Sequence, residues 1–320
     1  ERAGEVICFG QSVECRTNNS SCHPDIHATI QTVDGDSNFS VIGTDFRITF
    51  QKNTGKLISF HIGDLELVYD PVNTLKPEFW RAPTDNDEGF HMAQKCAVWK
   101  TASLYPEVKQ TVFRSENSTA LISILYDLGN GASCQVDFQI DSLGTMDIHE
   151  TYHGLAGLPY LPCFGLSWKF PKVLSRVSWY GKGPEETYQD RQSGGYLGVY
   201  ETTAEHSISP YVVPQECGNH TETRWVELTD TKGTGIRAES SVPFEFSVLP
   251  YTCHEMESAR HHYELPAPYS TVLRLLEAQT GVGGDNSWGA WAHEPYILKG
   301  DEDRIFHLRI KIVRNNNGQQ

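Results

Sequence analysis

The sequence predicts an all-β protein built as a large antiparallel β-sandwich. Apolar and polar residues alternate in short runs, most clearly over residues 39–50, which is the pattern of strands with one face toward solvent. The pair Asn130-Gly131 lies between two such runs and is typical of a hairpin turn. Only residues 90–100 and 253–263 favour helices. Many short strands with few helices indicate that sheet packs on sheet.

The strand candidates are distributed along most of the chain. They are residues 39–41, 46–50, 57–60, 65–69, 120–126, 134–140, 146–152, 163–170, 177–180, 224–229, 234–239, 244–249 and 304–313. Residues 1–37 are polar and poorly periodic, and residues 315–320 form a polar tail. We therefore expect one β domain over residues 38–314.

Composition excludes several classes of partner. The formal net charge is −15, whereas nucleic acids and anionic membranes attract concentrated Lys and Arg. No apolar run approaches the ~18–20 residues needed to span a bilayer. The eight cysteines contain no Cys-x-x-Cys pair, so their spacing predicts no metal site. We expect reduced thiols, a cytoplasmic protein, and neither a nucleic-acid nor a membrane partner.

A glycine-rich loop near the C-terminal end contains the first candidate binding residue. Three glycines within residues 281–284 permit close backbone approach, and the side chains of Asp285, Asn286 and Ser287 can bond to the turn. Such a loop can present the Trp288 indole to an apolar ligand face, as stacking on a sugar ring requires. The alternative is that Trp288 covers the core.

Four ordered segments resemble the C-terminal domain of β-galactosidases of glycoside hydrolase family 2. They are residues 79–89, 179–191, 210–219 and 283–288. The resemblance covers about residues 37–313, a region that forms a separate small subunit in some bacteria. It implies a galactose-mutarotase-like supersandwich. It also implies that residues 1–37 are the end of a preceding immunoglobulin-like domain and a linker.

The resemblance implies that the chain completes an active site whose catalytic groups lie elsewhere. Hydrolysis of β-galactosides such as lactose with retention needs two carboxylates about 5–5.5 Å apart. In the family these are glutamates of a TIM barrel, so we expect no catalytic residue in this chain. The partners would be the TIM-barrel and immunoglobulin-like domains, in cis or as a large subunit. The Mg²⁺ and Na⁺ of the family holoenzyme bind other domains, so no cofactor or metal is expected here.

The resemblance also assigns roles within the two loop segments. It places Trp288 beside the galactose subsite, with Asp285 and Asn286 as further substrate-binding candidates. The family's mobile active-site loop begins at the glycine matching Gly89, so Gly89, Phe90 and His91 are the mobile-loop candidates. The residues after Gly89 depart from the family pattern.

Three residues of segment 79–89 are candidates for structural support. Asp85 and Asp87 can cap the turn after Pro83, and Arg81 can pair with an aspartate. A calcium loop would need more oxygen ligands at regular spacing, which this acidic segment lacks.

Two other clusters leave alternatives open. We expect Glu185, Tyr188, Asp190 and Arg191 to form a hydrogen-bonded corner, since no Gly-Lys-Ser/Thr phosphate loop is present. The sequence around Glu216, His220 and Glu222 could supply the acid and base of an aldose-epimerase-like enzyme. A stand-alone carbohydrate-binding module is the second alternative to a β-galactosidase chain.

Overall fold

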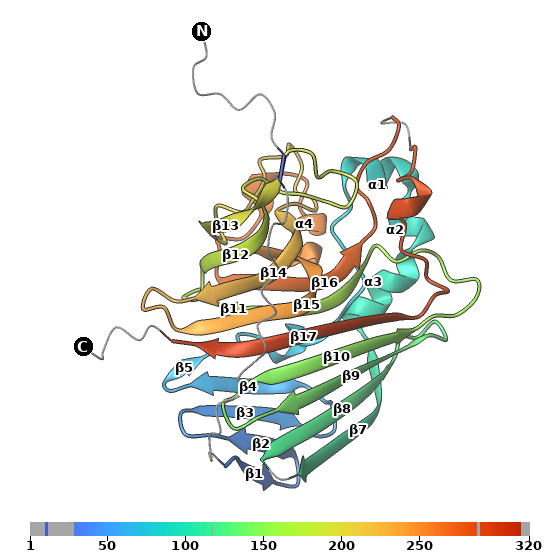
Figure 1. Ribbon diagram of the computed structural model, residues 1–320. Helices are drawn as coiled ribbons and strands as arrows, with labels where there is room; N and C mark the ends of the chain where they lie inside the picture. Colours follow the sequence, from blue (N-terminus) through green and yellow to red (C-terminus); the bar gives the residue numbers. More distant parts are fainter. Residues whose placement is uncertain (1–9, 12–28, 117, 287–288, 315–320) are drawn as a thin grey trace.

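The computed structural model describes residues 10–11, 29–116, 118–286 and 289–314 (Figure 1). The prediction of an all-β antiparallel fold is confirmed for these residues. Their strands are β1 (Gln31–Asp34), β2 (Asn38–Ile42), β3 (Phe46–Gln51), β4 (Leu57–Ile62), β5 (Leu65–Glu66), β6 (Thr74–Glu78), β7 (Glu107–Glu116), β8 (Thr119–Asp127), β9 (Ser133–Ile140), β10 (Met146–His153), β11 (Cys163–Pro171), β12 (Arg176–Gly183), β13 (Tyr196–Thr203), β14 (Asn219–Thr229), β15 (Gly235–Leu249), β16 (Ser270–Gln279) and β17 (Arg304–Val313).

The strands form two sheets. A five-stranded sheet has the simple order β1-β2-β3-β4-β5. A twelve-stranded sheet runs β13-β12-β14-β15-β17-β10-β9-β8-β7, and a branch leads from β15 through β16 and β11 to β6. The described strands pair antiparallel throughout, as in β10 with β17 and β15 with β16.

The branch originates in a single long strand. Residues 235–239 of β15 pair with β17, and residues 245–249 pair with β16. The sequence predicted two strands here, which is wrong, because residues 241–243 continue the strand while remaining exposed between the two pairings. This exposed stretch marks the place where the sheet divides.

Aromatic side chains fill the space between the sheets. The ring of Phe39 lies 5.3 Å from that of Phe113, and Phe50 lies 5.3 Å from Phe138. The five-stranded sheet therefore packs on strands β7 to β9, an arrangement visible in Figure 1. Burial of these rings supplies much of the hydrophobic stabilisation.

The helices are short. They are α1 (Asp85–Phe90), α2 (Met92–Lys95), α3 (Ala97–Leu104), α4 (Cys253–Ser258) and the 3₁₀ turns η1 (Pro71–Asn73), η2 (His262–Glu264) and η3 (Glu294–Tyr296). The prediction of one helix over residues 90–100 is wrong. His91 has a left-handed φ of 65° and Cys96 has a φ of −112°, which divide the segment into three helices. The predicted helix at 253–263 is shortened to α4 followed by η2.

The described residues bear on two predictions, that the chain has no membrane span and that its cysteines are reduced. No helix among them has the length and apolar character to cross a membrane. Cys96, Cys134, Cys163, Cys217 and Cys253 are free and buried. The other three cysteines lie outside the described residues.

Candidate functional site

Arg81 is the centre of the structure around the glycine-rich loop. Its side chain is fully buried, and its Nε and Nη2 donate to the two oxygens of Asp87 at 3.0 and 2.8 Å. Burial by itself would lower the pKa of Arg81, but the Asp87 carboxylate raises it above its ordinary value. The Arg81 guanidinium therefore stays charged, and the bidentate geometry holds both side chains in one orientation.

Asp87 also determines where α1 begins. Its carboxylate accepts the backbone N–H of Thr84 at 3.0 Å, and the Thr84 hydroxyl accepts the N–H of Asp87 at 3.1 Å. This reciprocal pair is a capping box, which satisfies amide groups at the helix start. Asp85 lies outside the ion pair: its side chain is exposed, and its backbone N–H donates to Gln215 at 3.1 Å.

The same guanidinium holds the start of the glycine-rich loop. Arg81 Nη1 donates to the carbonyl of Thr280, and Nη2 donates to the carbonyl of Gly281 at 3.1 Å. Nearby, Asn86 Nδ2 donates to the carbonyl of Val282 at 2.9 Å. Four bonds from one arginine thus connect α1 to a loop almost 200 positions away in the sequence.

A third segment fixes the loop from the other side. The carboxylate of Asp190 accepts the backbone N–H groups of Val282 at 3.1 Å and Gly283 at 2.7 Å. Two consecutive amides on one carboxylate determine the path of the backbone there. Asp190 therefore supports the loop, a role that its predicted place in a corner cluster did not indicate.

Close contacts explain two of the glycines. A Cβ on Gly284 would lie 2.3 Å from the carbonyl oxygen of Ala290. Gly289 has a φ of +97°, and a Cβ there would lie 2.5 Å from the carbonyl oxygen of Gly89. The loop therefore turns tightly on itself and passes against the end of α1, which Figure 1 shows at the same corner of the molecule.

Two of the predicted substrate-binding residues, Asp285 and Asn286, lie in the exposed part of this loop. The Asp285 carboxylate accepts a hydrogen bond from Nε2 of His293 at 2.9 Å, and both side chains are exposed. Asn286 is also exposed. Trp288 and Ser287 lie outside the described residues, so the structure describes the loop on both sides of Trp288 but not the indole.

The mobile-loop candidates are part of an aromatic contact. Gly89 and Phe90 end α1, and His91 follows in the left-handed conformation. The Phe90 ring stacks on Trp291 at 4.3 Å, and Lys95 Nζ lies 3.5 Å from the centre of the Phe90 ring. Motion at Gly89–His91 stays a prediction, and it would require this stacking to open.

A hollow of about 320 Å³ lies beside α1. Its lining residues are Thr84, Asp85, Asn86, Tyr188, Arg191, Tyr211, Gln215, Glu216 and Val282. Hydrogen-bonding groups from three segments therefore face one space next to the glycine-rich loop. Such a space can bind a polar ligand or the surface of another domain.

The corner beside this hollow is built on Glu186, whereas the sequence predicted Glu185, which is exposed. The Glu186 carboxylate accepts bonds from Tyr211, Arg191 and the backbone N–H of Gly218, the last at 2.6 Å. Burial raises the pKa of Glu186, but these bonds outweigh it and lower the pKa below its ordinary value. Both glutamates follow the end of β12 at Gly183, so strand alternation offers no signal that distinguishes them.

Two of the three residues of the epimerase alternative, Glu216 and His220, are engaged in the core, whereas Glu222 is partly exposed and pairs with Arg224. Both oxygens of Glu216 accept bonds from Arg274 Nη1, at 2.9 and 2.7 Å. The His220 ring lies 4.3 Å from Trp179 and 5.2 Å from Phe246, and burial lowers its pKa to about 4. Neither group is free to exchange protons with a substrate at the surface.

Sequence reasoning missed Arg274, because β16 was not among the predicted strands. The available signal was one arginine within the apolar run Val272-Leu273-Arg274-Leu275-Leu276. A charge in such a run is typical of a buried ion pair.

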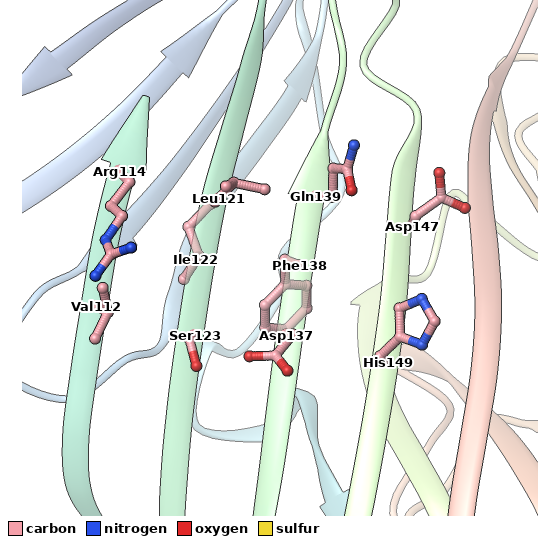
Figure 2. A pocket seen from close by; sticks show the side chains of 10 residues that line it. All are labelled: Val112, Arg114, Leu121, Ile122, Ser123, Asp137, Phe138, Gln139, Asp147 and His149. Carbon is pink, nitrogen blue, oxygen red and sulfur yellow. The ribbon is translucent and has the colours of Figure 1, made fainter. Parts of the chain in front are cut away.

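A second hollow, of about 390 Å³, lies away from the predicted site (Figure 2). Figure 2 shows side chains of β7 to β10 around it, among them Arg114, Asp137 and His149. Asp147 at its edge is paired with Arg309 at 2.7 Å. No predicted site residue lines this hollow. It lies on the large sheet and is separate from the glycine-rich loop.

Similar proteins are known across most of the chain. The β-galactosidase of Halalkalibacterium halodurans is 37% identical over 318 residues, which are 97% of this chain and 31% of that protein. The β-galactosidase small subunit of Latilactobacillus sakei is 36% identical over 309 residues, 86% of this chain and 96% of that protein. Galactose 1-epimerase from Lactobacillus acidophilus aligns over 90% of this chain and 99% of its own, with 6% identity and a TM-score of 0.45.

The long relatives extend well beyond the matched region. This chain spans about a third of the Halalkalibacterium protein and about a quarter of the Priestia megaterium β-galactosidase, which is 34% identical. Residues 42–310 match the family described as beta galactosidase small chain. The chain belongs to the β-galactosidase small chain family.

Proposed function

We propose that this chain is the small subunit, or the C-terminal region, of a family 2 β-galactosidase and completes its galactose-binding pocket. The catalytic glutamates would lie on a larger partner, in the same polypeptide or in a second one. The match to nearly the whole length of a small subunit supports this division. So does the much greater length of the other relatives.

The observation that carries the proposal is the fixed position of the glycine-rich loop. Arg81 holds its first carbonyls and Asp190 holds its next two amides, so the loop backbone is oriented before any ligand binds. A preorganised loop loses little conformational entropy on binding. Trp288, which follows in the same segment of the sequence, would then offer the apolar platform for galactose, and Asp285 and Asn286 would contribute polar contacts.

The reaction would be hydrolysis of terminal β-galactosides with retention, by two carboxylates of the partner. This chain would contribute substrate binding and exclude water from one side of the pocket. Two features inside the described part of the chain agree with this limited role: Glu216 is neutralised by Arg274, and His220 is buried among aromatic rings. We also propose a cytoplasmic location, supported by the five free cysteines.

Reconstitution tests the proposal directly. The chain is assayed for hydrolysis of a chromogenic β-galactoside alone and together with a family 2 catalytic large chain. We expect activity only in the mixture. Activity of the chain alone would contradict the assignment of the catalytic carboxylates to a partner. Anomer interconversion or sugar binding by the chain alone, without reconstitution, would instead favour the epimerase or the binding module.

Replacing Trp288 tests its role in the pocket. Stacking of an indole on a sugar is worth about 1–2 kcal/mol, so Trp288→Ala should raise KM for the galactoside about 5- to 30-fold in the reconstituted enzyme. The matched control is Trp225→Ala, because Trp225 lies on β14 and contacts Arg237 instead of the loop. Equal KM values for the two variants would contradict the stacking role.

A further inference from the structure

Three potential metal ligands, two of them buried and one partly buried, lie close to the segment that leads to Arg81. A carboxylate oxygen of Glu78, the sulfur of Cys253 and a ring nitrogen of His254 all lie within 4.8 Å of one another. Glu78 is the last residue of β6, and the other two are the first residues of α4. Residues distant in the sequence thus meet at one point.

The polar atoms of this group are poorly satisfied by protein partners. Both ring nitrogens of His254 are buried, and neither has a hydrogen-bond partner. The carboxylate nearest to its Nδ1 belongs to Glu257, at 3.9 Å, which is too far for a hydrogen bond. A buried imidazole with two unpaired nitrogens is costly unless another ligand uses one of them.

The Glu78 carboxylate is also buried with few hydrogen-bond partners. Only 3% of its surface is exposed, and its carboxylate accepts one long bond, from the Trp80 N–H at 3.3 Å. Within the described residues it takes part in none of the ion pairs found. Buried carboxylates are normally paired with a cation or coordinate a metal.

We propose that Glu78, Cys253 and His254 form a zinc-binding site. Zinc takes sulfur, imidazole and carboxylate ligands at about 2.0–2.3 Å in tetrahedral geometry, so the three atoms would close to about 3.5 Å from one another. Binding displaces the thiol proton to solvent and gives the Cys253 thiolate, and a water molecule completes the fourth position. Burial raises the pKa of the free Cys253 thiol, and a divalent cation would offset that effect.

The site would join β6 to α4. Glu78 lies three positions before Arg81, and residues 84–86, which line the hollow beside α1, follow shortly after. Trp80 already links these elements, since its Nε1 donates to Glu257 at 3.1 Å. Zinc would therefore strengthen the base on which Arg81 is held. Cysteine spacing predicted no metal, because one ligand is a glutamate from a distant strand.

Cobalt binding to the metal-free full chain tests the site. We expect Co²⁺ to give a thiolate-to-cobalt absorption band, and Cys253→Ser to abolish it. Removing one ligand should weaken Zn²⁺ binding by about 100-fold or more. Cys217→Ser, at another buried free cysteine, is the matched control and should retain the band. Absence of the band in the unmodified chain, or its persistence in Cys253→Ser, would overturn the proposal.

A stability measurement covers the case in which a variant folds poorly. Zn²⁺ should raise the melting temperature of the unmodified chain, because a ligand that binds only the folded state stabilises it. His254→Ala, at a partly exposed position, should lose this increase. An unchanged melting temperature in the unmodified chain, or the same increase in His254→Ala, would overturn the site. Neither readout depends on β-galactosidase activity.

Discussion

Two buried arginines, Arg81 and Arg274, show how the same ion-pair chemistry serves different ends. Each guanidinium is almost inaccessible, and each pairs with a carboxylate, Asp87 or Glu216. Nη1 and Nη2 of Arg81 also donate to carbonyls of the glycine-rich loop, whereas Nη2 of Arg274 donates to the Trp80 carbonyl and the Cys163 sulfur in the core. The first pair therefore positions a surface loop, and the second holds strands together.

The largest expected effect is on the core pair. Arg274→Met leaves the Glu216 carboxylate buried without a cation, which should reduce the free energy of unfolding by about 3–5 kcal/mol. Chemical denaturation of the chain measures this. The double variant Arg274→Met with Glu216→Leu should lose much less, since two apolar residues can replace a buried pair. Equal losses in the single and double variants would show that the ion pair is not the cause.

Titration of the core provides the next test. Burial raises the pKa of Glu245 to about 7, although Asn219 donates to it at 2.8 Å. The folded carboxyl keeps its proton while the unfolded one ionises near pH 4.5. The contribution of Glu245 to stability is therefore full below about pH 4.5 and falls by about 3 kcal/mol as the pH rises to 7.

The contribution of His220 to stability depends on pH in the opposite direction. Burial lowers its pKa to about 4 from 6.5, so its contribution is full above about pH 6.5 and is lost as the pH falls toward 4. The two effects oppose each other in unmodified protein. Glu245→Gln should therefore expose a loss of stability on acidification, measured by denaturation at several pH values between 4.5 and 7. Parallel pH profiles for the two proteins would contradict the raised pKa of Glu245.

Replacing each arginine by lysine should have a smaller effect on stability and should show that only Arg81 affects activity. Arg81→Lys keeps the charge but cannot reach Asp87 and two loop carbonyls together. We expect a loss of about 2–3 kcal/mol in unfolding free energy and a fall of up to about 100-fold in kcat/KM of the reconstituted enzyme. Arg274→Lys is the control, with reduced stability and unchanged kcat/KM of the folded complex. A similar kcat/KM loss in both variants would remove the distinction drawn above.

The smallest effect concerns the contact between the loop and α1. Gly289→Ala should cost about 1–2 kcal/mol, because it combines a positive φ with the nearby carbonyl of Gly89. Gly157→Ala is matched to it: its φ is +90°, but a Cβ there meets no atom within 4 Å. Thermal denaturation should show the larger loss for Gly289→Ala. Identical losses would mean that the close approach carries no energy.

Alternating sequence patterns predicted several strands that have one face toward the core and one toward solvent. Strands β8, β9 and β10 alternate between buried and partly exposed residues, and each was predicted close to its bounds. Strands β6 and β16 are buried along nearly their whole length and were missed, although β11, which is buried to the same extent, was predicted. Strands β7 and β13, whose residues are partly or largely exposed, were missed too, so alternation explains only part of the outcome. The division of helix 90–100 depended on His91, whose left-handed conformation has no signal in the residue type.

The sequence by itself determined the family, the antiparallel strands and the glycine-rich segment, because these depend on local composition and on ordered motifs. Tertiary structure decided which charged groups meet. Arg81 reaches Thr280, Asp190 reaches Gly283, and Glu78 lies beside Cys253 only because strands distant in the chain end at one corner. Hydrogen bonds and ion pairs act over a few ångströms, and spacing along the chain does not specify such distances between remote residues.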